Sequence, residues 1–186
     1  MTDSTPYDVG FDIYLRGAAR RRVGTSAGER EARAERTEHM AKGIHHIPEG
    51  LPAVTPQLVC KDARALVAWA GKAFGAELAH AMPNPDGKGI MHGMMVIGGA
   101  KIFVSDAGGF AQPTSANLFV YVPDVDAAVA RAAEAGGKVL APVSDMFWGD
   151  RWGMVADPSG NVWQVATHTE NVTPEEMQAR MQKMAK

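Results

Sequence analysis

The sequence predicts an α+β domain of two tandem β-α-β-β-β modules, residues 52–110 and 115–170, followed by a C-terminal helix at 171–186. Three observations support this class. Strand-like and helix-like hydrophobic periods alternate from residue 51 onward. The order of these elements repeats once, with an offset of 62 residues. A capping-box sequence with proline at the first helical position begins a last helix near residue 173.

The composition is that of a globular protein with a substantial core. The chain has 186 residues, of which 46% are hydrophobic and 22% are charged, and its formal net charge is -2. This balance excludes a strongly basic nucleic-acid-binding surface. No apolar run approaches the roughly 18 residues of a membrane helix, and the N-terminus lacks the apolar stretch of a signal peptide. We therefore expect a cytoplasmic protein with no nucleic-acid or membrane partner.

The first 50 residues form an Arg-rich extension that differs from the rest of the chain. Residues 16–36 hold seven arginines and three glutamates and almost no large apolar side chain. Such a segment buries too little surface to offset the entropy of ordering, so we expect poor order, with room for a short solvated helix around 27–38. Two alternatives stay open: the arginines contact RNA or an anionic surface, or translation begins at Met40.

The first module begins with a predicted strand at 54–60. Asp62 is placed to cap a helix, and Gly75 is placed to end it. The apolar residues between them follow the i, i+3, i+4, i+7 spacing of one buried face: Leu66, Trp69, Ala70, Ala73 and Phe74. Three short strands follow at 78–82, 91–97 and 101–105, with a hairpin turn at Gly98-Gly99 between the last two.

The second module repeats this order. A strand at 117–122 precedes a helix capped by Asp124 or Asp126, and strands at 138–143, 151–156 and 161–167 follow. Nine of the eighteen positions from 62 to 79 are identical to the residues 62 places later. In the last helix, three methionines are spaced to form an apolar stripe that we expect to pack into a core: Met177, Met181 and Met184.

Several short motifs occur in a characteristic order along residues 51–180. They are Val54–Val59, Lys72–Glu77, Met91–Gly93, Asp124–Asp126, Trp148–Gly153, Asp157–Asn161 and Ala166–Glu170. Together they resemble the vicinal oxygen chelate superfamily of glyoxalase I, bleomycin-resistance proteins, extradiol dioxygenases and fosfomycin-resistance enzymes, most closely its PhnB-like branch. The resemblance implies that the modules form a U-shaped mixed-sheet cleft that holds the ligand. It also implies a homodimer, because relatives usually build the site across a two-fold axis.

The resemblance further implies where a metal ion would bind, with one ligand on the first and one on the last strand of each module. Those positions are occupied by Thr55, Phe103, Asn117 and Gln164. None of them carries an imidazole or a carboxylate, whereas divalent metal sites need two or three such donors. A slip of two residues keeps the same strand face and brings in no His, Asp or Glu. We therefore expect no metal and no cofactor.

Two histidines and one arginine are the candidates for chemistry. His92 shares a predicted strand face with Met94, so it is a candidate general base or ligand partner; the alternative is a structural histidine. Arg151 is a candidate catalytic residue that suits an anionic ligand; the alternative is an ion pair to Asp150 or Asp157 that fixes its loop. His168 follows the last strand, where we expect it to cap the sheet edge; the alternative is that it faces the mouth of the cleft.

Strand alternation predicts which strand residues line the cleft, and the aromatic loop before the strand at 151–156 adds to them. The alternation gives Gln57, Phe103, Asn117, Phe119, Tyr121 and Gln164 as ligand-binding residues, and the loop gives Trp148 and Asp150. They describe an aromatic pocket with a few amide hydrogen bonds, which suits a flat organic ligand better than a phosphorylated metabolite.

Two functional hypotheses follow. The first is a metal-independent protein of the bleomycin-resistance type that sequesters or carries an aromatic or amphipathic drug or metabolite. The second is a glyoxalase-like lyase or isomerase with His92 as base and with Arg151 or Gln164 holding an oxyanion. The missing metal ligands favour the first hypothesis.

Overall fold

The computed structural model describes residues 26–41, 45–108 and 111–184. The chain divides into two compact units, Met1–Glu49 and Gly50–Lys186. In the first unit, α1 (Ala27–Ala41) is the short helix that the sequence allowed. It begins with a capping box, since Glu29 accepts from the Ser26 backbone N–H and Ser26 Oγ accepts from that of Glu29. The arginine run at 20–22 lies outside the described residues.

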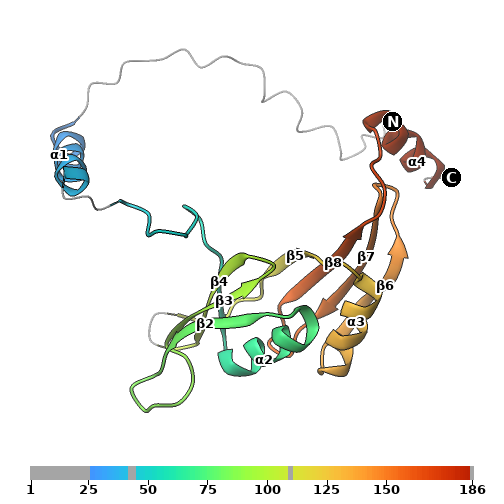
Figure 1. The fold of residues 1–186 in the computed structure, drawn as a ribbon, viewed down its shortest axis with the longest axis horizontal. Helices are drawn as coiled ribbons and strands as arrows, with labels where there is room; N and C mark the ends of the chain where they lie inside the picture. The colour runs from blue at the N-terminus through green and yellow to red at the C-terminus, as the bar shows by residue number, and fades with distance from the viewer. Residues whose placement is uncertain (1–25, 42–44, 109–110, 185–186) are drawn as a thin grey trace, which may run out of the picture. The chain divides into compact units, whose positions relative to one another are not determined.

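Two four-stranded mixed sheets form the second unit (Figure 1). The first sheet has the order β1-β4-β3-β2, in which β1 and β4 are parallel and the other pairs are antiparallel. Its elements are β1 (Gln57–Cys60), α2 (Ala63–Phe74), β2 (Glu77–Met82), β3 (His92–Ile97) and β4 (Ala100–Asp106).

The second sheet repeats this topology with the order β5-β8-β7-β6. Here too the first and last strands of the module, β5 and β8, are parallel. Its elements are β5 (Asn117–Tyr121), α3 (Val125–Glu134), β6 (Lys138–Asp145), β7 (Asp150–Ala156) and β8 (Val162–His168), and α4 (Pro174–Met184) follows. The predicted α+β class, with two repeated β-α-β-β-β modules and a C-terminal helix, is therefore confirmed. None of the described helices is long and apolar enough to cross a membrane.

The helix boundaries follow from local side-chain chemistry. Asp62 and Asp124 cap α2 and α3, and each carboxylate accepts from the backbone N–H three residues later. This selects Asp124 rather than Asp126 as the second cap. Gly75 ends α2 at a φ of 72°, a left-handed conformation that favours glycine.

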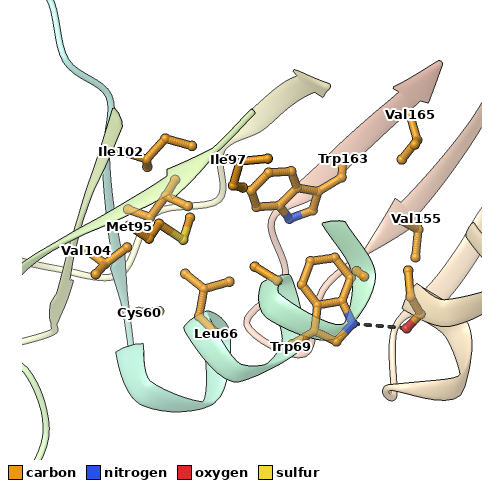
Figure 2. Packing of buried hydrophobic residues seen from close by; sticks show 14 of the residues in the cluster. Cys60, Leu66, Trp69, Met95, Ile97, Ile102, Val104, Val155, Trp163 and Val165 are labelled. Carbon is orange, nitrogen blue, oxygen red and sulfur yellow. Dashed lines mark hydrogen bonds between the residues drawn. The ribbon is translucent and has the colours of Figure 1, made fainter. Parts of the chain in front are cut away.

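The helices α2 and α3 lie on the same side of the two sheets and pack against each other (Figure 1). Trp69 of α2 donates its indole N–H to the Ala132 carbonyl of α3 at 3.0 Å (Figure 2). Trp163 of β8 packs on Trp69 and Phe74, with ring centroids 5.8 and 5.2 Å apart. The two modules therefore share one hydrophobic core instead of having one each.

The last helix, α4, has less contact with this core. Thr173 and Glu176 form the predicted capping box, and Arg180 makes a bidentate ion pair with Glu170 at 2.6 and 2.7 Å. Met177 is half-buried, but Met181 is 54% exposed. The expectation that the methionine stripe packs into a core is thus not met at Met181.

Replacing Trp163 with alanine is expected to destabilise the whole second unit, because its ring packs against residues of both modules. Loss of a buried tryptophan costs about 3–5 kcal/mol of unfolding free energy, whereas Val54→Ala at an exposed position should cost under about 0.5. Urea unfolding followed by circular dichroism measures both. Two separate transitions in the wild-type protein would contradict a shared core.

Candidate functional site

The candidate site consists of the two sheet faces that point away from α2 and α3. Alternate residues of each strand are buried against the helices, so the residues between them form the opposite faces. We call these the first and second open faces. The first carries Gln57, His80, Met82, His92, Met94, Phe103 and Ser105, and the second carries Asn117, Phe119, Tyr121, Asp150, Trp152, Met154, Gln164, Ala166 and His168.

On the first open face, His92 lies where the sequence predicted it, on a half-buried strand position. Its ring centroid is 4.8 Å from that of Phe103 and 6.3 Å from that of His80. Gln57 donates to the Ser105 hydroxyl at 3.2 Å. The structure therefore brings together three of the predicted site residues, Gln57, His92 and Phe103.

On the second open face, a buried carboxylate joins three strands. Asp150 is 3% exposed and accepts hydrogen bonds from the Tyr121 hydroxyl at 2.9 Å and the Trp148 indole at 3.0 Å. Nδ1 of His168 lies 2.7 Å from the other Asp150 oxygen, and its Nε2 lies 3.0 Å from the Asn171 side-chain oxygen. This Asp150 network ties β5, β7 and β8 together.

These contacts shift the pKa values of the three titratable members. Burial pushes the pKa of Asp150 upward, but hydrogen bonds from His168, Tyr121 and Trp148 outweigh it and hold that pKa below its usual value. The bonds to Asn171 and Asp150 raise the pKa of His168. The bond to Asp150 raises the pKa of Tyr121, whose hydroxyl therefore stays a donor to Asp150 and offers only lone pairs to a ligand.

Trp152 carries an unpaired polar atom on the same face. Its indole Nε1 is buried and has no hydrogen-bond partner among the described residues. Strand register puts Tyr121, Ala166 and Trp152 in one row across β5, β8 and β7, and the Trp152 ring centroid is 6.5 Å from that of Trp148. Phe119 extends this aromatic surface, with its ring 5.1 Å from that of Tyr121.

The four positions where the resemblance implied a metal hold no strong donor set. In the second module, Gln164 donates one hydrogen bond to Asn117 at 3.1 Å, and both groups are neutral amides. In the first module, Thr55 precedes β1, and Phe103 lies opposite Gln57. Across residues 26–41, 45–108 and 111–184, no three His, Cys, Asp or Glu side chains are grouped so that they could hold a metal ion.

Arg151 lies on the opposite side of β7 from Asp150 and Trp152. Its guanidinium binds Asp126 through two hydrogen bonds of 2.6 and 2.8 Å and Asp145 through one of 3.0 Å. Asp126 above all raises the pKa of Arg151, followed by Asp145. The ion-pair partners are therefore not Asp150 or Asp157, as the sequence suggested, and the structure does not bring Arg151 near His92.

The sequence favours His168 at the sheet edge over the cleft mouth, and Trp152 is not among the predicted ligand-binding residues. The alternation that located Gln164 also puts Ala166 and His168 on its face, because all three are two residues apart on β8. That signal could have identified His168. The unpaired state of the Trp152 N–H depends on its surroundings in the folded chain and has no sequence signature.

A hollow of about 350 Å³ lies between the segment before β1, the β3–β4 hairpin and the strands β5 and β8. Its lining is mostly apolar and includes Pro52, Ile102, Leu118, Phe119 and Trp163. Of the predicted ligand-binding residues, only Phe119 lines it. The other seven lie around the two open faces and the loop before β7.

The Asp150 network should make stability depend on pH. Because the folded state raises the pKa of His168, protonation of this histidine stabilises the fold. That stabilisation is complete below the unfolded pKa of 6.5 and is lost as the pH rises through the folded pKa. The lowered pKa of Asp150 has the opposite effect: its stabilisation is present above the unfolded pKa of 3.8 and is lost on acidification. His168→Gln is therefore expected to lower the unfolding free energy more near pH 5.5 than near pH 9. Urea titrations at both pH values measure this, and His46→Gln, at an exposed histidine, is the control. An equal loss at both values would contradict it.

The comparisons with known proteins agree with this fold. A family model described as Glyoxalase/Bleomycin resistance protein/Dioxygenase superfamily matches residues 43–165. An uncharacterized protein of Mycobacterium bovis is 36% identical over 141 residues, which span 70% of this chain and 92% of that protein.

Two solved structures illustrate the likeness. TioX from Micromonospora sp. ML1 is 26% identical with a TM-score of 0.54, covering 63% of this chain and 99% of that one. The PhnB protein of Bacillus cereus is 16% identical with a TM-score of 0.50, covering 62% of this chain and 99% of that one, which shows the fold alone. With its family model and its repeated modules, the chain belongs to the Glyoxalase/Bleomycin resistance protein/Dioxygenase superfamily.

Proposed function

We propose that this protein binds a flat aromatic or amphipathic small molecule on its second open face, without a metal ion, and so sequesters or carries a drug or metabolite. The observation that carries this proposal is the unpaired indole N–H of Trp152. A buried donor without a partner costs about 1–3 kcal/mol, so a ligand oxygen that accepts from it gains that free energy on binding. Trp152 is itself only half-buried, so a turn of its ring can bring the N–H to a ligand.

The surroundings of Trp152 support an aromatic ligand. Phe119 and Tyr121 are 46% and 61% exposed, which leaves two large rings beside Trp152 open to stacking. The Tyr121 hydroxyl donates to Asp150, so its oxygen can accept a hydrogen bond from the ligand. This combination favours a ligand with flat rings, one carbonyl and one N–H or O–H group.

Metal independence is supported by the chemistry of the amide pair. Asn117 and Gln164 are neutral and are bonded to each other, so neither supplies the anionic or imidazole donor that a divalent ion prefers. Binding on this face then depends on stacking and hydrogen bonds alone.

We further propose that two copies complete the binding cleft. Proteins of this family bind small molecules and are often dimers. Each open face carries exposed apolar side chains, Met82 on the first and Phe119 and Tyr121 on the second. Exposed apolar surface of this kind supports burial against a second subunit.

The alternative function is a lyase or isomerase with His92 as its base. One observation favours it: His92 lies on the first open face beside an aromatic ring and a second imidazole. Arg151 would not hold the oxyanion in such a reaction, because it lies on the side of β7 opposite the second open face and already binds Asp126 and Asp145. Gln164 is the remaining candidate for that role. Turnover of a carbonyl substrate that is lost in His92→Ala would establish this alternative over simple binding.

Coumarin and naphthalene are matched probes for the binding site, because they have the same fused-ring size and only coumarin has a carbonyl acceptor. We expect the wild-type protein to bind coumarin more tightly than naphthalene. The Trp152→Phe substitution removes the N–H and keeps a ring, so it should lower the affinity for coumarin roughly five- to hundredfold and hardly change the affinity for naphthalene. Isothermal titration in EDTA measures both. No binding of either probe, or loss of coumarin binding in EDTA, would contradict the proposal.

If two copies complete the cleft, the wild-type protein should sediment as a particle with the mass of two chains at micromolar concentration. Phe119→Glu places a charge in the exposed apolar surface and should shift the protein to monomer, whereas Val54→Glu, at a position 81% exposed and outside the strands, should leave the dimer intact. Analytical ultracentrifugation distinguishes these outcomes. A wild-type monomer would exclude a shared cleft.

A further inference from the structure

Two His-x-Met segments face each other on the first open face, and the proposed ligand site does not use them. His80-Ala81-Met82 lies in β2 and His92-Gly93-Met94 lies in β3. The strands are antiparallel, and their register pairs Met82 with His92 and His80 with Met94. Each histidine therefore lies directly across from a methionine.

All four side chains project from the same side of the sheet. Gly93 and Met95 are buried toward α2, so the alternation of β3 turns His92 and Met94 to the open face. Residues directly opposite in an antiparallel pair share a face, which places His80 and Met82 there as well. The result is a two-by-two patch, here called the His-Met patch, in which imidazoles occupy one diagonal and thioethers the other.

The spacing of the imidazoles suits a single ion between them. Their ring centroids are 6.3 Å apart. A nitrogen about 2 Å from a metal puts its ring centroid roughly 3 Å away, so two opposed imidazoles on one ion lie about 6 Å apart. The thioethers on the other diagonal can then approach the same ion.

We infer that His80, Met82, His92 and Met94 form a binding site for Cu(I). Thioether sulfur is a soft ligand that selects Cu(I), and imidazole binds copper readily, whereas Mg²⁺ and Ca²⁺ require oxygen ligands. All four ligands are neutral in the form that binds a metal, which suits a monovalent ion better than Zn²⁺ with its preference for thiolate or carboxylate partners.

The position of the patch allows a metal ion to enter. His80 is exposed and Met82 is 53% exposed, so one edge of the patch is open to solvent. Phe103 covers the other edge, with its ring 4.8 Å from that of His92. The patch lies on β2 and β3, whereas the family resemblance implied metal ligands on the first and last strands of each module.

Cys60 is the one thiol of the chain, and a thiol is a soft ligand that could compete for Cu(I). Its side chain is 2% exposed and lies on the helix side of β1, so it does not face the patch. Copper bound by the patch is thus distinguishable from copper bound by the thiol.

The test is competition for Cu(I) between the full-length protein and bathocuproine disulfonate, under anaerobic conditions with ascorbate. We expect one Cu(I) per chain in the wild type, and a loss of affinity of at least about tenfold in Met82→Leu and in Met94→Leu. Met91→Leu is the matched control, because this exposed methionine precedes β3 and lies outside the patch. X-ray absorption should show both nitrogen and sulfur neighbours of the copper.

Three results would overturn the inference: no Cu(I) binding, unchanged affinity in the Met82→Leu/Met94→Leu double variant, or loss of binding in Cys60→Ala with the patch intact. Circular dichroism verifies that each variant is folded. The Cu(I) site and the proposed site for an aromatic ligand can be tested independently of each other. Met82→Leu should leave coumarin binding unchanged, and Trp152→Phe should leave Cu(I) binding unchanged, because the two sites lie in different modules.

Discussion

The contact between Trp69, Phe74 and Trp163 is the interaction on which the rest of the second unit depends. These rings come from α2 and β8, and the Trp69 N–H reaches the α3 carbonyl of Ala132, so elements of both modules meet at one point. This contact puts both helices on the same side of the two sheets (Figure 1). The core occupies one face of each sheet, so neither α2 nor α3 covers the apolar side chains on the other face.

The second open face is held in shape by a carboxylate instead of by packing. Asp150 is buried, and the fold tolerates this charge because three side chains hydrogen-bond to it. They are Tyr121 of β5, Trp148 of the loop that precedes β7, and His168 of β8. The same bonds fix the direction of the Tyr121 hydroxyl and the position of Trp148. Trp152 is the exception in this satisfied network, since its N–H has no partner among the described residues. A single unpaired donor beside a satisfied network is the arrangement from which ligand recognition is proposed.

The two open faces derive from one repeated topology but carry different chemistry. The first has two imidazoles, two thioethers and a phenyl ring, and the second has indole rings, phenol and a buried acid. Both modules keep the aspartate that caps their helix, Asp62 and Asp124, and a glycine with positive φ in the turn before their last strand, Gly98 and Gly160. Positions on the open faces carry no such requirement, so they were free to diverge. This explains how one fold presents an aromatic surface in one module and a soft-metal patch in the other.

Much of this protein was determined by the sequence on its own. Asp62, Asp124 and Gly75 fixed the helix ends, and the period-two pattern identified the helix-facing and open sides of β3 and β8, including the place of His92 and Gln164. These features are local, because a cap or an alternation involves residues within one turn or one strand. Only the tertiary structure decided the partners of Arg151, the bond from His168 to Asp150 and the pairing of the two His-x-Met segments. Those contacts join residues far apart in the chain, and strand order and register decide them, which no local pattern specifies.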